Sequence, residues 1–521
     1  MKKIICMAVG ILMFNSCNDL NLVPLDKLTA DQYYKTAAEF DGGMFAAYSS
    51  IQDLWGTSTE TLGESGEYWK ISDVVSDDVN AEPNADNISK DADNLNIRAS
   101  DIPYAAAYTQ IYEGLFRCNT VLEHLEMENE LTDDEKKVFE GEAKFLRAWF
   151  HFEALKLWGT PPLVVATFKS LDNLSVPNAT KAQLFAQILD DFNVAFENLP
   201  DAWDAANTGR ATKWAARAFT GKVNVWNNDM AGAITAFEDV IANGVGAAGQ
   251  YGLIDTDDPM QDLEDVFAFD NENNKESIFE IQFGGPHSDD NVWVFDDTHS
   301  ESFKASQGTG RSMYWDAGGF TTSEGDGGKN GWWTPTDDLV STFEPGDARL
   351  SSFIYQDGDT YYVWNSAVIE KPFDPGWSST GYVVKKYGGR RNVAAGDFSG
   401  NNQGNFNNER MFRFAELKLL YAEALLAEGR AGDATDQVND IRDRAGLGDL
   451  PGVATLADVQ REKRLELCFE GQRWFDIRRW DIGATIFGST WDDKFVVFPI
   501  PLSEIDRTKG TTGEITQNTG Y

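Results

Sequence analysis

Cysteine, histidine and long apolar runs are scarce in this chain of 521 residues. It has four cysteines and four histidines, and no cysteine cluster has a spacing typical of a metal site. Beyond the first residues, no run approaches the ~18 apolar residues that a membrane-spanning helix needs. A Gly-x-Ser-x-Gly elbow, a His-Glu-x-x-His motif and a phosphate-binding glycine loop are also absent. These absences argue against serine hydrolases, zinc proteases and nucleotide-dependent enzymes.

Basic residues are few relative to acidic ones. The chain has 44 Lys and Arg against 84 Asp and Glu, which gives a formal net charge of −40. Such a protein repels phosphate backbones, so we expect no nucleic-acid partner, whereas neutral glycans, peptides and cations remain as ligands. Pairs of acids are so common here that they are no evidence for glycosidase chemistry. We expect no catalytic residues and no required cofactor; a structural Ca²⁺ stays open, without EF-hand spacing and with no residues assigned to it.

The first residues have the pattern of an export signal. Lys2 and Lys3 precede the apolar stretch Ile4–Phe14, and Cys17 follows where a bacterial lipoprotein is cleaved and acylated. We predict a signal peptide at residues 1–16, a lipidated Cys17 and a tether over 17–30; a secreted protein cut elsewhere is the alternative. The cysteines that remain, Cys118 and Cys468, lie among apolar neighbours and are predicted to be buried free thiols.

Helical periodicity dominates both ends of the remaining chain. Apolar spacing predicts helices over 104–128, 133–157, 180–198, 211–227, 231–243, 411–428, 432–445 and 456–470. Residues 214–237 and Leu419–Arg444 each form a helix, a polar turn and a second helix, with small residues that permit close packing. Such units bury their apolar faces only by stacking, which suggests a tetratricopeptide-like array. We therefore predict a mostly α fold, with helical parts at residues 31–244 and 409–521.

Residues 245–408 differ from both ends. They are rich in Gly, Asn, Asp, Trp and Tyr, and short alternating runs such as Thr360–Trp364 and Gly381–Val384 predict loops and short strands. An irregular insertion of this length is unusual unless it carries function. We predict that it forms much of a binding subdomain, within one structural unit that spans residues 31–521.

The run Arg461–Trp480 combines dense charge with aromatic rings. Its first half predicts a helix that ends at Gly471, with arginines and glutamates one turn apart. The second half mixes arginines with Trp474, Phe475 and Trp480, which favours guanidinium groups stacked on rings. We interpret the run as scaffold, an ion-pair network that fixes the C-terminal helices.

Five separated blocks resemble one family, the SusD-like (RagB/SusD) outer-membrane lipoproteins of Bacteroidetes. The blocks are Ala143–Leu163, Gly331–Arg349, Arg413–Leu447, Arg461–Trp480, and Phe498–Pro501 with Gln517–Tyr521. The resemblance implies a tetratricopeptide-based frame, a lipid anchor in the outer membrane that faces the cell exterior, and a SusC-like TonB-dependent transporter as partner. It implies non-catalytic capture of oligosaccharides or, in RagB-like members, of peptides. None of these matching blocks is identified as the ligand site.

Aromatic residues outside the helical patterns are the candidate glycan contacts. Sugars present apolar C–H faces and a rim of hydroxyls, which rings together with carboxylates, amides or guanidinium groups satisfy. The proposed stacking platform consists of Trp69, Trp293, Tyr314, Trp315, Trp332 and Trp333. Asp77, Asp78 and Arg390 are predicted to add hydrogen bonds. For Asp77 and Asp78 the structural alternative is a solvated face or a helix cap, and for Arg390 it is a surface salt bridge. His287 and His299, with nearby aspartates, leave a metal site as a further alternative.

Overall fold

The computed structural model of the chain describes residues 33–55, 67–168, 175–283, 311–317, 331–364, 368–388 and 407–521. The longer helices of the N-terminal part are α3 (Ala37–Trp55), α6 (Ile102–Leu125), α7 (Asp133–Trp158), α8 (Lys181–Asn198), α9 (Lys213–Trp226) and α10 (Met230–Asn243). The α-helices of the C-terminal part, long and short, are α15 (Phe414–Ala427), α16 (Ala431–Arg444), α17 (Leu456–Leu467), α18 (Arg473–Arg479), α19 (Gly483–Phe487) and α20 (Leu502–Thr508). The predicted mostly α fold is confirmed. None of the described helices is both long and apolar enough to cross a membrane.

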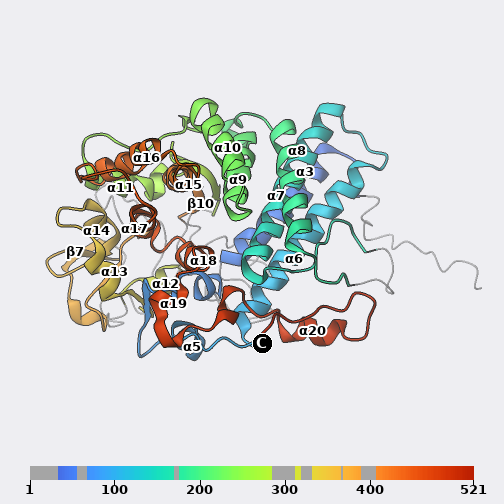
Figure 1. Cartoon of the computed structure of the whole chain (residues 1–521). Helices are drawn as coiled ribbons and strands as arrows, with labels where there is room; N and C mark the ends of the chain where they lie inside the picture. The colour runs from blue at the N-terminus through green and yellow to red at the C-terminus, as the bar shows by residue number, and fades with distance from the viewer. Residues whose placement is uncertain are drawn as a thin grey trace, which may run out of the picture.

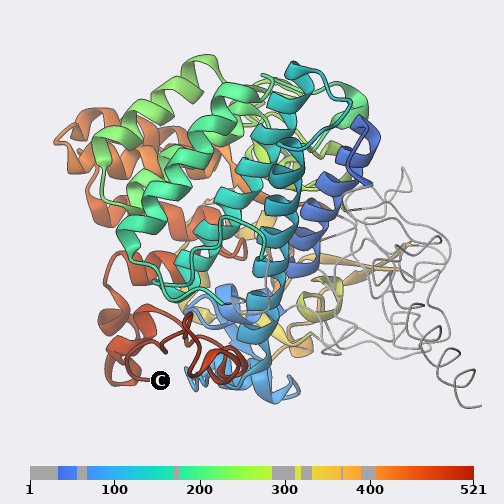
Figure 2. The ribbon, with the colours of Figure 1, turned by 90° about the vertical axis from the view of Figure 1, so that its right-hand side faces the viewer.

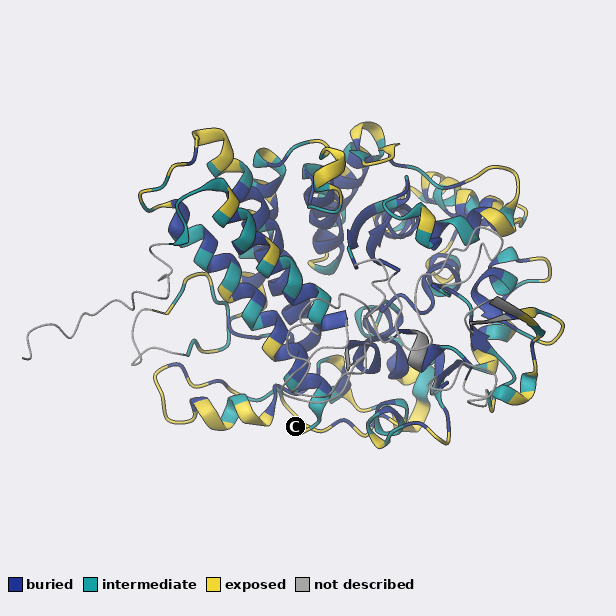
Figure 3. Cartoon of the chain, turned by 180° about the vertical axis from the view of Figure 1, so that it is seen from behind, coloured by how far each residue is buried: buried dark blue, intermediate teal, exposed yellow. Residues whose placement is uncertain are grey.

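The helices pack in sequence order as neighbours. Figure 1 shows α3 and α6 to α8 on one side, α9 and α10 in the middle, and α15 to α17 on the other side. Small residues permit this close packing: a Cβ built on Gly114 of α6 would lie 2.1 Å from the Phe150 ring of α7. Thr132 and Thr180 begin α7 and α8 with capping boxes, in which the threonine and the residue three positions later bond each other's backbone N–H. Figure 3 shows that buried residues concentrate where these helices face one another.

Short helices and strands occupy residues 67–93 and the middle of the chain, and the sequence predicted short elements only for residues 245–408. The helical ones are α4 (Glu67–Trp69) with a π-helical turn at Lys70–Val74, α5 (Asn87–Asp93), α11 (Pro259–Val266), α12 (Arg311–Trp315), α13 (Asp337–Thr342) and α14 (Ala348–Phe353). The strands are β1 (Val79–Ala81), β2 (Val245–Gly246), β3 (Gly249–Gln250), β4 (Ser277–Ile281), β5 (Trp333–Pro335), β6 (Ile354–Tyr355), β7 (Thr360–Trp364), β8 (Val368–Pro372), β9 (Val383–Val384) and β10 (Glu409–Arg413). The strand predicted at Thr360–Trp364 is β7, and that at Gly381–Val384 is reduced to β9.

Two-stranded antiparallel pairs join the middle of the chain to both helical ends. Strand β4 pairs with β10, so Ile281 lies opposite Glu409. The two ends of the segment between these residues are therefore adjacent in space. Strand β1 pairs with β5, with Ala81 opposite Trp333. The other pairs are β2 with β3, β6 with β9 and β7 with β8. These pairings hold the irregular region against the helical frame.

A buried ion-pair network connects the sequence blocks of the C-terminal half. Arg413, the last residue of β10, donates to Glu466 at 2.7 Å and to Glu470 at 2.7 Å. Arg444 of α16 also pairs with Glu466, and Arg349 of α14 donates to Glu462 of α17 at 2.8 Å. All of these side chains are almost completely buried. The network predicted for the Arg461–Trp480 run is therefore present, and it reaches into two other blocks.

One detail of that run differs from the prediction. Helix α17 ends at Leu467 rather than at Gly471, and both Phe469 (φ 64°) and Gly471 (φ 70°) adopt left-handed backbone conformations. A Cβ on Gly471 would lie 2.7 Å from the ring of Trp55, so the glycine permits close contact with α3. Its N–H donates to Asp73 at 3.1 Å.

The C-terminal segment packs along one edge of the helical array. Helices α19 and α20 lie along the same edge in both views (Figures 1 and 2). Asn518 donates to the backbone oxygens of Trp158 at 3.0 Å and Phe498 at 2.7 Å. The Trp158 indole in turn donates to the backbone oxygen of Pro499 at 3.2 Å. Both remaining cysteines, Cys118 and Cys468, are free and buried, as predicted.

Candidate functional site

Four of the predicted aromatic residues converge on one cluster. Trp333 of β5 lies with its ring centroid 6.2 Å from Trp69, 5.3 Å from Trp315 and 4.7 Å from Tyr314, against which it stacks. Arg311 sits 5.2 Å from the Trp69 ring, where it supplies a cation–π contact. The sequence therefore identified residues that do meet in space, although the chain separates Trp69 from the others by more than 200 positions.

The cluster is buried, which differs from the exposed platform expected. The side chains of Trp69 and Trp333 are 0% exposed, Trp315 is 2% exposed and Tyr314 is 3% exposed. Trp333 also donates its indole N–H to the Ser89 hydroxyl at 3.0 Å. Because protein atoms cover these ring faces, the four residues act as core in the described structure, and a ligand has no access to them.

Trp332 is the partly exposed member of the group. Trp332 directly precedes β5 and is partly exposed, whereas Trp333 is 0% exposed, and the Trp332 indole also packs against the core. The backbone N–H of Trp332 donates to the oxygen of Tyr314 at 2.8 Å, and its oxygen accepts from Glu82 at 2.8 Å. These two bonds fix the position of the indole, whose centroid lies 5.2 Å from that of Tyr314.

Polar groups share the strand face of Trp332. The β1–β5 register places Asn80 opposite Thr334, and Glu82 lies one residue beyond the pair Ala81–Trp333. The Glu82 carboxylate accepts from the Ser379 backbone N–H at 2.9 Å and from the Thr334 hydroxyl at 2.8 Å. Asn80 donates to the exposed Ser379 hydroxyl at 3.3 Å. We name Trp332, Asn80, Glu82, Thr334 and Ser379 the Trp332 face; sequence reasoning identified only its tryptophan.

The two predicted aspartates are committed to arginines of the Arg461–Trp480 run. Arg473 donates two hydrogen bonds to Asp77, at 2.7 and 2.8 Å, and Arg464 donates to Asp78 at 2.6 Å. Burial opposes ionisation of Asp77, but the hydrogen bond and charge of Arg473 outweigh it and hold its pKa below the ordinary value. Asp78 is 1% exposed. Both aspartates therefore form ion pairs within the protein, which differs from the predicted ligand contact and from the solvated face or helix cap that was its alternative.

Other predicted residues lie outside the described part of the chain. These are Trp293, Arg390 and Cys17, together with His287 and His299. Within the described residues, no group of three or more His, Cys, Asp or Glu side chains is placed to hold a metal ion. Among the partly exposed aromatics, Trp377 packs edge-on against Tyr361 and Phe373, so it supports the β7–β8 hairpin.

A partly exposed ring beside polar side chains, on a helical frame, is an arrangement that occurs in ligand-binding proteins. The family model described as "SusD family" matches residues 214–493, which is more than half of the chain. A second, described as "Starch-binding associating with outer membrane", matches residues 55–225. The chain belongs to the SusD family, and it is a non-catalytic binding protein.

Individual relatives agree with this assignment. A SusD-like protein of Bacteroides ovatus is 26% identical over 410 residues, which cover 74% of this chain and 67% of the relative. A SusD-like protein of Bacteroides fragilis has a similar solved structure, with TM-score 0.75, 23% identity and coverage of 96% and 100%. A structure described as a laminarin-binding SusD-like protein matches with TM-score 0.74, 23% identity and coverage of 94% and 100%. The fold is thus shared over nearly the whole chain.

Proposed function

We propose that this protein binds oligosaccharides at the cell surface, without catalysis, and delivers them to a SusC-like TonB-dependent transporter. The observation that carries the proposal is the Trp332 face. There one indole presents apolar surface, while the amide of Asn80 and the hydroxyl of Ser379 offer donors and acceptors. An apolar plane beside a few convergent polar groups suits a sugar ring. The laminarin-binding relative with the same fold supports glycan as the ligand class.

The alternative ligand is a peptide, which pairs with exposed backbone groups along a groove or strand edge. On the Trp332 face the backbone is already engaged: Trp332 bonds Tyr314 and Glu82, and β1 pairs with β5. The face therefore offers side chains rather than free backbone groups. This arrangement favours glycan over peptide.

The proposed site on the cell is the outer surface of the outer membrane, with the lipid on Cys17 as the anchor. Support comes from the lipoprotein pattern at the N-terminus and from the family described as associating with the outer membrane. The proposed transporter contact is an apolar patch formed by Phe116, Val165 and Phe168, which are 55%, 42% and 40% exposed. Phe116 and Phe168 line an apolar groove of about 230 Å³ between α6, residues 162–168 and α20, and Val165 lies in the segment that forms one of its walls. Exposed apolar surface of this kind is typical of a protein interface.

Affinity gel electrophoresis of the chain lacking residues 1–17 tests the ligand class. We expect retardation by laminarin or by another neutral polysaccharide, such as starch, xylan, mannan or pectic galactan. A set of peptides, measured by calorimetry, is the comparison. Retardation by no polysaccharide, together with saturable peptide binding, would replace the proposed function by peptide capture.

A further inference from the structure

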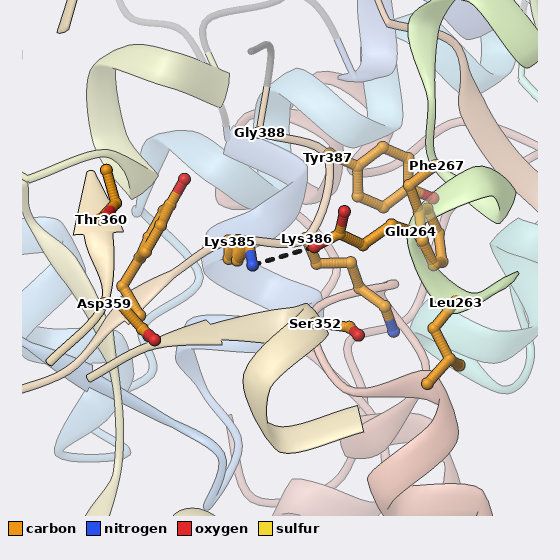
Figure 4. Close-up of a pocket in the computed structure, with 11 residues that line it drawn as sticks. Leu263, Glu264, Phe267, Ser352, Asp359, Thr360, Lys385, Lys386, Tyr387 and Gly388 are labelled. Atoms are coloured by element: carbon orange, nitrogen blue, oxygen red, sulfur yellow. Dashed lines mark ion pairs between the residues drawn. The ribbon is translucent and has the colours of Figure 1, made fainter. Parts of the chain in front are cut away.

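A second cavity lies apart from the Trp332 face. It has a volume of about 220 Å³ and opens between α11, the end of α14, the start of β7 and residues 385–388 (Figure 4). Its wall includes the polar groups of Glu264, Ser352, Asp359, Thr360 and Lys385 and the ring of Tyr355. None of these residues belongs to the Trp332 face, and none was predicted from the sequence as a ligand contact.

The charged groups at this cavity are paired but can exchange partners. Lys385 Nζ lies 2.9 Å from Glu264 Oε1, and these side chains are 23% and 21% exposed. The same ammonium donates to the Ser351 oxygen at 2.9 Å and lies 5.6 Å from the Tyr355 ring centroid. A partly exposed ion pair contributes little to stability, so a ligand hydroxyl can replace one of its contacts at small cost.

The neighbouring lysine does not add a usable charge. Lys386 Nζ is buried and donates to the oxygens of Glu466 at 2.9 Å, Cys468 at 3.0 Å and Glu470 at 2.6 Å. The charges that remain on the wall are Lys385, Glu264 and Asp359, which together do not favour an anion. The Ser352 hydroxyl is 3.4 Å from the Met260 oxygen, a long contact that leaves the hydroxyl able to turn toward a ligand.

The size of the cavity limits the occupant to a small molecule. At ~30 Å³ for each water, it holds about seven waters, and it is smaller than the ~300–1,000 Å³ pockets of drug-sized ligands. A neutral pyranose ring matches this volume and presents both hydroxyls for Asp359, Glu264 and Lys385 and a C–H face for Tyr355. We propose that the cavity binds one neutral sugar residue, a chain end or a branch of the glycan. This inference rests on the proposed function.

Saturation-transfer NMR with methyl glucoside, galactoside, mannoside and xyloside tests the cavity directly. We expect at least one of them to bind the chain lacking residues 1–17, and to bind equally well to Trp332→Ala. Two cavity variants should weaken this binding at least tenfold. Lys385→Met removes the ammonium donor from the cavity wall. Thr360→Trp fills the opening of the cavity with a ring, and Thr360 is an exposed strand position, where aromatic residues are well tolerated. Unchanged melting temperatures confirm that both variants fold.

Three results separate the inference from the proposed function. Retardation by a polysaccharide without binding of any methyl glycoside overturns the cavity site and leaves the proposed function standing. Loss of methyl glycoside binding in Trp332→Ala, with retention in both cavity variants, also overturns it, because the ring then binds at the Trp332 face. Absence of binding to every polysaccharide and methyl glycoside overturns both.

Discussion

Arg413 donates to Glu466 at 2.7 Å although both side chains are almost completely buried. Glu466 is shared: Arg444 and Arg349 also approach it from α16 and α14. Burial alone would raise the pKa of Glu466, but the charges of Arg444, Arg413 and Arg349 lower it to about 2. One carboxylate therefore joins three segments of the chain, and its ionised form is required for the network.

Replacement of this carboxylate should strongly destabilise the protein. Glu466→Gln leaves three buried guanidinium groups without their shared anion, and we expect a loss of about 3–5 kcal/mol in the free energy of unfolding. Chemical denaturation measures it. The control is Glu428→Gln at the exposed end of α15, for which we expect less than about 0.5 kcal/mol. Equal stability of the two variants would contradict the role of the network.

The same residue predicts a loss of stability in acid. The folded pKa of Glu466 is about 2 and the ordinary value is 4.5, so the unfolded chain binds a proton first as the pH falls. The contribution of Glu466 is complete above pH 4.5 and disappears between pH 4.5 and about 2. Melting temperatures measured across this range should fall steeply for the parent and less for Glu466→Gln. Parallel curves would show that other carboxylates dominate.

Asp73 predicts the opposite trend near neutral pH. Burial raises the pKa of Asp73 to about 7, and the hydrogen bond from the Gly471 N–H, which lowers the pKa, offsets only part of this rise. The folded chain then binds a proton that the unfolded chain has released, so between pH 3.8 and about 7 this group lowers stability as the pH rises. Asp73→Asn, which keeps an acceptor for Gly471, should become increasingly more stable than the parent from pH 5 to 8. Asp357→Asn in an exposed turn is the control, and an equal pH profile for both variants would refute the assignment.

The apolar patch predicts a surface variant that affects only the partner. Val165→Asp puts a charge on the exposed segment that borders the groove lined by Phe116 and Phe168, and we expect at least a tenfold loss of co-purification with the co-expressed transporter. Val453→Asp is the matched control, since Val453 is 63% exposed in the loop before α17. Both variants should melt like the parent. Full retention of the transporter by Val165→Asp would show that the transporter binds another surface.

The helical frame was predictable because its signals are local. Apolar residues at helical spacing predicted α7 and α8 within one residue of their observed bounds, where Thr132 and Thr180 are seen to cap them. The ion-pair network was also predictable, since an arginine- and glutamate-rich run with buried aromatics has few other uses. The partners Arg349, Arg413 and Arg444 were not, because they come from other segments.

The candidate site was only partly predictable. Trp69 and Trp333 have polar neighbours in the sequence, which suggested exposure, but residues more than 200 positions away bury them. Strand β5 begins at Trp333 and leaves Trp332 just outside it, a boundary that is known only once β1 is seen to pair there. Asp77 and Asp78 were predicted to contact ligand because the sequence does not show that they pair with Arg473 and Arg464, which lie almost 400 residues away.

The central claim is that glycan binds at the partly exposed ring of Trp332. Calorimetric titration with the polysaccharide that retards the parent in gels, applied to Trp332→Ala and Trp315→Ala, tests it most directly. For Trp332→Ala we predict at least about tenfold weaker binding, equivalent to ~1.4 kcal/mol, with little change in melting temperature. Trp315→Ala should instead lose about 3–5 kcal/mol of stability, because it removes a core ring. Binding of parent strength by Trp332→Ala would contradict the account.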